Sequence, residues 1–474
     1  MITEKAYGET LRAQVLTSFC HPAFWLSLAF LANVFEGAVR KWVPGFASGA
    51  GRNLAYFSKD LILVLGVVLM TGRVWRAASG LEELRKWGLP ALGLIACGGL
   101  LSLSSGINAV GAALTLRALL VLPVLAYFYA GWSGKRFPLL GFAFVGVVLG
   151  VGNGVLGLIQ SGLPSSHFVN KYAADELFVV ELASGVRATG TFAYITGLGV
   201  ASAMGVWAGM VMISLARSKW QLLWGVVGIF GGIACAFASI SRGTVVTAIA
   251  MLAVWALSSV RASRLMVKGA LVAGGVGLVL LLIFPGLAER FTNVGLGVFD
   301  RFESAGDNNT QRAVGQWGEM WEAVMETPSG NGLGTEQVGG NVATKGVASF
   351  TTYESQFPRI VAELGVLGFV GFLAMVAVVI MGLQRMKHGP GGASWDMVVT
   401  ATQVYLLGQF YTNVAFNHTA SAFVWLVVAA VFAAEPVGRR RRRRVKRKRP
   451  GRVGDRMEGG AEGMPIETSA NVPS

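Results

Sequence analysis

The sequence of 474 residues is poor in charge, since Asp, Glu, Lys and Arg make up only 14% of it. A soluble domain carries about 25% of such residues. Hydrophobic residues instead make up 53% of the chain. These values exclude a soluble globular protein. A membrane-spanning helix, or span, needs roughly 20 apolar residues, so the apolar content allows up to about twelve spans.

Cysteine and histidine are also scarce. The three cysteines, Cys20, Cys97 and Cys235, are too few and too scattered for a disulfide framework or a metal site. The sequence contains no HExxH, GxSxG or DxD pattern, so it offers no support for metal-dependent or serine-hydrolase chemistry, and we expect no cofactor. The first twenty residues lack the apolar core of a signal peptide, so we expect the first span to target the chain.

Apolar runs predict an all-α, polytopic membrane protein with about 12 transmembrane helices. The runs lie at residues 22–39, 57–71, 88–105, 109–131, 138–160, 190–215, 219–239, 243–260, 269–286, 359–384, 396–414 and 419–436. The predicted order is a cytoplasmic N-terminus (1–21), helices 1–9 (22–286), a long extracytoplasmic loop with short helices (287–358), helices 10–12 (359–436) and a basic tail (437–474).

The net charge of +15 is distributed unevenly and predicts the orientation. With both termini in the cytoplasm, the inside segments hold 27 basic residues and the short outside connections hold seven. Cytoplasmic connections are enriched in Lys and Arg, so this orientation is favoured. We therefore expect both termini in the cytoplasm and the long loop outside.

A basic tail begins with RRRRRRVKRKRP at Arg439, directly after the last predicted span. Such a run can bind nucleic acid or act as a lipid-regulated switch. Because it abuts a membrane helix, we favour an anchor on anionic lipids and expect no nucleic acid. The remaining tail lacks apolar periodicity and is predicted to be disordered.

The long loop contains a predicted helix that begins near Asp307 and ends near Glu326. Its apolar stripe includes Trp317 and Trp321, while its glutamates follow another stripe. This pattern fits an interfacial helix that lies over the membrane, and it fits an ordinary packed extracytoplasmic helix equally well. The following segment, SGNGLGTE (329–336), lacks the context of a phosphate loop, so its glycines favour a helix end and a tight turn.

Charged residues within the predicted spans are costly and each needs a physical reason. Glu36 and Arg40 are one helical turn apart and can form an ion pair. Arg117 lies inside the fourth span, where it can reach outer headgroups, and Glu363 lies just inside the tenth. Because all four lie in the outer halves, they suggest a polar cavity that opens outward.

Three arginines, Arg187, Arg242 and Arg359, lie at predicted outer ends of spans, where the positive-inside rule disfavours them. Arginines at such positions can bind a diphosphate bidentately, although each can also contact a carbonyl or a lipid. His418 lies in the predicted turn between the last two spans. It is a candidate proton carrier, although a single histidine in a turn is more often structural.

Four sequence segments, taken in order, are similar to segments of a known protein family. They are GVRATGTFAYITGLG (185–199), ASISRGTVVTAIAML (238–252), the loop helix that ends in TPSGNGLG, and YESQFPRIVAELGVLGF (353–369). Their order resembles the O-antigen ligase/polymerase superfamily of bacterial membrane glycosyltransferases. FEGAVRKWVP (35–44) is similar to a stretch of some polymerase-like members.

The resemblance implies transfer of a glycan from a polyprenyl diphosphate lipid to an acceptor hydroxyl, at the outer face of the inner membrane of a bacterium. It implies that Arg187 and Arg242 bind the diphosphate, with Arg312, Arg359 and Arg117 as further candidates. The expected partners are the lipid-linked glycan, an acceptor glycan and other polysaccharide assembly proteins.

One departure concerns the position where ligases carry His-Asn, because this chain has Glu354 and Ser355. Glu354 is therefore the candidate general base, and the change favours a polymerase of a surface or exported polysaccharide. A ligase that transfers a finished glycan to a lipid or protein stays open. So do a twelve-helix polysaccharide or solute transporter and a scaffold that does not catalyse a reaction.

Overall fold

The structure is a computed structural model of the chain. The residues that it describes are 21–46, 49–70, 82–132, 137–173, 181–182, 185–260, 262–268, 271, 295–296, 306–336, 356–387, 392–412 and 417–434. Every structural statement below concerns these residues. The predicted N-terminal segment lies outside them apart from His21, and so does the whole of the predicted basic tail.

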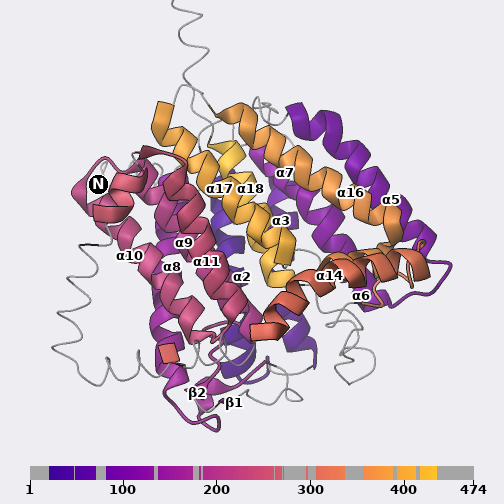
Figure 1. The fold of residues 1–474 in the computed structure, drawn as a ribbon, viewed down its shortest axis with the longest axis horizontal. Coiled ribbons are helices and arrows are strands. Elements are labelled where there is room, and N and C mark those ends of the chain that lie inside the picture. The colour runs from indigo at the N-terminus through magenta and orange to yellow at the C-terminus, as the bar shows by residue number, and fades with distance from the viewer. Residues whose placement is uncertain are drawn as a thin grey trace, which may run out of the picture. The chain divides into compact units, whose positions relative to one another are not determined.

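The described chain is helical apart from one very short hairpin (Figure 1). Its elements are α2 (Pro22–Trp42), α3 (Gly49–Met70), η1 (Leu84–Gly88), α5 (Leu89–Ser102), α6 (Ala109–Leu116), η2 (Arg117–Val121), α7 (Leu122–Trp132), α8 (Leu139–Ser161), η3 (Phe168–Asn170), β1 (Glu181–Leu182), β2 (Gly185–Val186), α9 (Ile195–Leu215), α10 (Lys219–Ala238), α11 (Arg242–Leu257), α14 (Gly306–Glu326), α16 (Gln356–Met386), α17 (Gly392–Thr412) and α18 (His418–Ala433). Strands β1 and β2 are antiparallel, with Glu181 opposite Val186.

The predicted helical membrane architecture is confirmed. In the described residues, seven helices are long and apolar enough to cross a membrane, and two further apolar helices, α11 and α18, are shorter. The count of twelve spans is not confirmed, because α5 and the two shorter helices fall below the usual spanning length. The predicted run 269–286 lies outside the described residues apart from residue 271.

Helix α3 corrects one predicted boundary. The apolar pattern predicts this span at 57–71, whereas the helix begins at Gly49. Lys59 and Asp60 therefore lie well inside the helix rather than in its first turn, and the Lys59 side chain is buried. A buried charge within a span requires a partner.

The core is centred on α9, which packs between α8, α10 and α17 (Figure 1). Helix α9 is apolar on all sides, the pattern of a fully buried helix. The contact between α9 and α10 is close because small residues face each other. A Cβ atom at Gly209 would lie only 2.5 Å from the carbonyl oxygen of Gly225.

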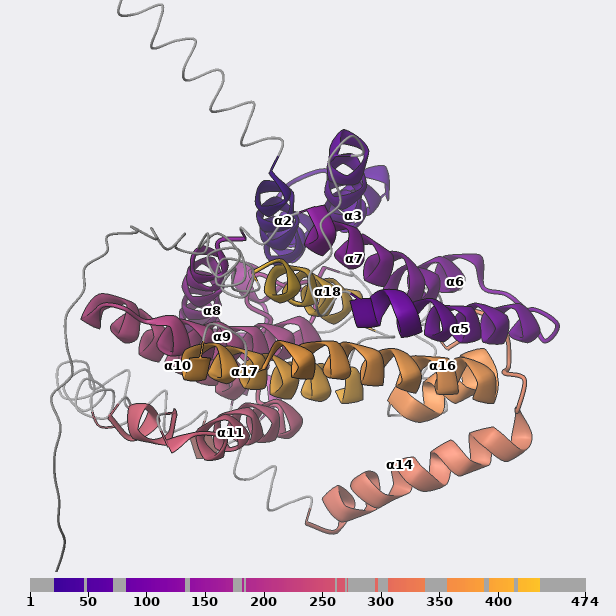
Figure 2. The same cartoon turned by 90° about the horizontal axis from the view of Figure 1, so that it is seen from above.

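Helix α16 contains a break at Gly365, where φ is 68° and ψ is −177°. The residues at this break contact the 327–336 loop, since Val366 N donates to Pro328 O at 3.0 Å. Helix α14 lies along the first part of α16 at one edge of the described chain (Figure 2). The 327–336 part of the long loop therefore contacts the membrane helix α16 at this break.

The close α9–α10 contact gives a stability prediction. We expect Gly209→Val to separate the two helices and to cost about 1–3 kcal/mol, because the added atoms meet backbone. The matched control is Gly152→Val in α8, where an added Cβ would meet no atom within 4 Å. Thermal unfolding in detergent should give a lower Tm for Gly209→Val only. Equal Tm values for the two variants would contradict the packing.

Candidate functional site

The segment that follows β2 lies against the turn between α10 and α11. Ala188 N donates to Ala238 O at 3.1 Å, and Arg187 Nε donates to Ser239 O, also at 3.1 Å. Arg242 is the first residue of α11, three residues beyond Ser239. The structure therefore brings the segment of Arg187 to the turn that leads into Arg242. Two motifs that are far apart in sequence can form one site only if the fold brings them together in this way.

The α10–α11 turn has an unusual backbone. Ile240 has φ of 46°, and its side chain is fully buried. A β-branched residue in the left-handed region is rare, and such strain costs about 1–3 kcal/mol. Burial of Ile240 against Ala236 and Val245 opposes this cost. The turn is held in one conformation, which fixes where α11 and Arg242 begin.

Two polar side chains of α8 bind the backbone of the 187–193 segment. Gln160 Oε1 accepts from Thr189 N at 3.1 Å and from Gly190 N at 2.7 Å. Asn153 Oδ1 accepts from Thr191 N at 2.8 Å. Buried backbone amides outside a helix need hydrogen-bond partners within the protein, and these side chains provide them. They are not among the residues singled out from the sequence, although isolated amide side chains in an apolar run are a usable signal.

Helix α2 contacts the same segment through the FEGAVRKW stretch. Lys41 Nζ donates to Thr189 Oγ1 at 2.9 Å and to Gly190 O at 2.6 Å. At Gly37 the helix approaches the segment so closely that a Cβ would lie 2.1 Å from Ala193 N. Lys41 is buried, and its acceptors among the described residues are neutral. A buried lysine side chain thus holds the segment that carries Arg187 against α2.

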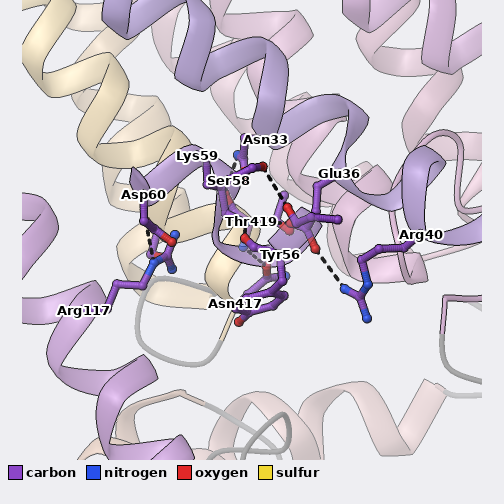
Figure 3. A network of polar contacts seen from close by, with 12 residues as sticks. Asn33, Glu36, Arg40, Tyr56, Ser58, Lys59, Asp60, Arg117, Asn417 and Thr419 are labelled. Carbon is purple, nitrogen blue, oxygen red and sulfur yellow. Dashed lines mark hydrogen bonds and ion pairs between the residues drawn. The ribbon is translucent and has the colours of Figure 1, made fainter. Parts of the chain in front are cut away.

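A second group of charges joins α2, α3 and η2 (Figure 3). Glu36 accepts from Arg40 at 2.8 Å and from Lys59 at 2.6 Å, so the predicted Glu36–Arg40 pair is confirmed. Arg117, on the π-helical turn η2, contacts Asp60 at 2.7 Å. In an apolar bundle such pairing offsets the cost of burying each charge.

This network changes the interpretation of the intramembrane charges. Arg117 is buried and bonded to a carboxylate, so it does not extend to outer headgroups. The network reaches α18 through Arg117 Nη1, which donates to Ser421 Oγ at 3.4 Å. The described charges of the network pair with one another. Their geometry supports a structural role that joins four helices.

Glu363 is buried within α16 and contacts two other elements. Its Oε1 accepts from Thr115 Oγ1 of α6, and from Gly334 N of the loop at 2.8 Å. The loop itself has glycines with positive φ at 330, 332 and 334. The segment SGNGLGTE is therefore a turn that packs between α6 and α16, as its sequence indicated. Its amides bind protein groups such as Glu363.

Arg359 lies in the first turns of α16, one helical turn before Glu363. Its charge acts on Glu336, at the end of the loop. Burial raises the pKa of the Glu336 carboxyl, while Arg359 and a hydrogen bond from Asn331 oppose the rise. A carboxylate and an arginine are thus close together where the long loop meets α16.

Three predicted residues cannot be placed in this geometry. Glu354 lies outside the described residues. Arg312 lies in α14 and His418 begins α18, but their side chains are also outside the described part. No group of three or more His, Cys, Asp or Glu that could hold a metal occurs in the described residues.

The long apolar helices indicate an integral membrane protein. Residues 227–373 match the family described as O-antigen ligase. The match covers about a third of the chain, and this stretch is similar to members of that family. The matched stretch includes the α10–α11 turn, α14 and the loop that contacts Glu363. A comparison with curated proteins found no match.

The charge network gives a second prediction. Glu36→Leu leaves Lys59 buried without its carboxylate, so we expect a loss of about 3–5 kcal/mol in the free energy of unfolding. Adding Lys59→Met removes the stranded charge and should restore part of that loss. Unfolding in detergent of both single variants and the double variant forms a double-mutant cycle. Additive losses in the double variant would contradict the coupling.

Proposed function

We propose that this protein is a membrane glycosyltransferase that polymerises a polyprenyl-diphosphate-linked glycan at the outer face of a bacterial inner membrane. The donor is the lipid-linked glycan, and the acceptor is a hydroxyl of a second glycan. The family match and the membrane helices support this class. In the proposed topology both termini are cytoplasmic, the 287–358 loop is extracytoplasmic, and the basic tail contacts anionic lipids.

One observation carries the assignment of the donor site. The hydrogen bonds of Ala188 and Arg187 to the α10–α11 turn connect the two arginine motifs. We assign the diphosphate to Arg187 and Arg242, because guanidinium groups bind phosphate oxygens bidentately. Arg312 and Arg359 are further candidates on α14 and α16. We leave Arg117 out of the set because it is bonded to Asp60.

The chemistry needs a stabilised leaving group and a base. The acceptor oxygen bonds to the anomeric carbon of the donor, and the bond from that carbon to the diphosphate oxygen breaks. Polyprenyl diphosphate leaves with the electron pair, and the arginines stabilise its charge. One donor placed for such a charge contributes about 3 kcal/mol, or roughly 10²–10³ in rate. In the proposal Glu354 accepts the proton of the attacking hydroxyl. The transfer uses no metal.

A ligase is the second candidate, because the matched family is described by that name. Against it, the chain has Glu354 and Ser355 where ligases carry His-Asn. Product analysis distinguishes the two reactions. A ligase leaves glycan on an acceptor lipid or protein, whereas a polymerase lengthens the chain on its own lipid carrier.

The direct test uses Arg187→Ala, Arg242→Ala, Arg242→Lys and Glu354→Gln. We expect each alanine variant to lower chain elongation by about 10²–10³, since a charge-stabilising donor is lost. Arg242→Lys should recover only part, because lysine lacks the bidentate geometry. Glu354→Gln should abolish long chains. Polysaccharide length is measured by electrophoresis of cell extracts, and rates are measured with purified lipid-linked donor.

The control is Arg217→Ala, in the short connection between α9 and α10, away from the donor site. Its chain lengths should equal those of the wild type. Membrane levels of every variant are compared by immunoblot. Normal elongation by Arg187→Ala and Arg242→Ala at wild-type levels would overturn the donor site, and normal elongation by Glu354→Gln would overturn only the base.

A further inference from the structure

Helix α14 has three distinct faces. The first packs on α16, where Ala323 is fully buried against Val361 and Ala362. The second carries Trp317, Trp321 and Met325, spaced four residues apart and therefore on one side of the helix. At about 100° per residue, the third face lies roughly 130° around the helix axis from the second and carries three glutamates, so we call it the glutamate face. These are Glu319, Glu322 and Glu326.

The second face is open although it is strongly apolar. Trp317 is 52% exposed, Trp321 is 64% exposed and Met325 is 67% exposed. A soluble domain rarely leaves two tryptophans and a methionine uncovered in one row, and a row of this kind marks an interaction surface. We call these three residues the tryptophan face.

The tryptophan face is continuous with the apolar surface of the membrane helices. The ring of Trp317 lies 6.0 Å from that of Phe357, at the start of α16. Phe357 in turn lies 5.3 Å from Tyr411, at the end of α17. Tyr411 is 42% exposed and follows the exposed Leu407 on the same helix. Aromatic rings gathered at the ends of spans are typical of the belt at a membrane–water boundary.

We propose that the tryptophan face is inserted in the headgroup region of the lipid bilayer. The occupant of the surface is therefore lipid. The continuity of the face with Phe357, Tyr411 and the exposed side of the spans argues for it, because that side faces lipid in an integral membrane protein. Glu322 and Glu326, on another side of the helix, are exposed, as the polar face of an amphipathic helix in an interface requires.

This contact would have a structural consequence for the loop. Helix α14 leads directly into the 327–336 turn, which binds Glu363 and lies against α6. A helix fixed at the bilayer surface sets the height of that turn relative to the membrane. The inference concerns membrane geometry, so it does not rest on the proposed glycosyl transfer.

The test places a nitroxide spin label on each face in the full chain. Cys20, Cys97 and Cys235 are first replaced by serine or alanine. Single cysteines are then introduced as Met325→Cys on the tryptophan face and Glu322→Cys on the glutamate face. Val64→Cys, at a 47% exposed position of the α3 span, is the reference for lipid. The labelled proteins are reconstituted in nanodiscs of phosphatidylethanolamine and phosphatidylglycerol.

Power saturation reports access to oxygen, which concentrates in lipid, and to a water-soluble nickel complex. We expect the label at 325 to have a ratio of oxygen access to nickel access between those of the other two labels. The label at 64 lies in the hydrocarbon and sets the high ratio, and the label at 322 lies in water and sets the low ratio. Both positions are exposed, and equal Tm values for the labelled proteins verify that the fold is unchanged.

Equal nickel access at 325 and 322 would overturn the proposal. It would also be overturned if the label at 325 became shielded only when an oligosaccharide was added, since the tryptophan face would then bind glycan. Neither outcome bears on elongation by the arginine variants, so this inference and the proposed function fail separately.

Discussion

The site depends on one constraint, which is that a non-helical segment inside an apolar bundle must find hydrogen-bond partners within the protein. The 187–193 segment meets this requirement through Gln160 and Asn153 of α8 and through Lys41 of α2. Without these partners its amides would each remain unsatisfied at a cost of about 1–3 kcal/mol. The same bonds that satisfy the backbone also place Arg187 beside the α10–α11 turn. The hydrogen bonds that satisfy the polar backbone groups of this segment therefore also position the candidate donor site.

Charge divides the buried polar groups into two kinds. Glu36 with Arg40 and Lys59, and Asp60 with Arg117, form ion pairs whose main effect is to join helices. Lys41 differs, because its two acceptors in the described chain are neutral, a hydroxyl and a carbonyl of the 187–193 segment. These two bonds hold that segment against α2.

Much of the helical architecture could be predicted from apolar runs, because each described run forms a helix close to its expected bounds. The start of α3 could not be predicted, because Arg52 and Asn53 interrupt the apolar pattern before residue 57. Lys59 and Asp60 lie inside the helix beside partners that are distant in sequence, Glu36 and Arg117. The positions of Arg187 and Arg242 were predicted from motifs, whereas Gln160 and Asn153 were missed. Their function is visible only when α8 and the segment lie together.

The family match covers residues 227–373, so Arg187 and its segment lie outside it. Their connection to the matched domain is physical. Ala188 and Arg187 donate to Ala238 and Ser239, which lie within the match. The buried, left-handed Ile240 keeps that turn in a single conformation. Two hydrogen bonds thus hold the segment of Arg187 against the matched stretch, and loss of the turn's geometry would separate the two arginines even with both side chains intact.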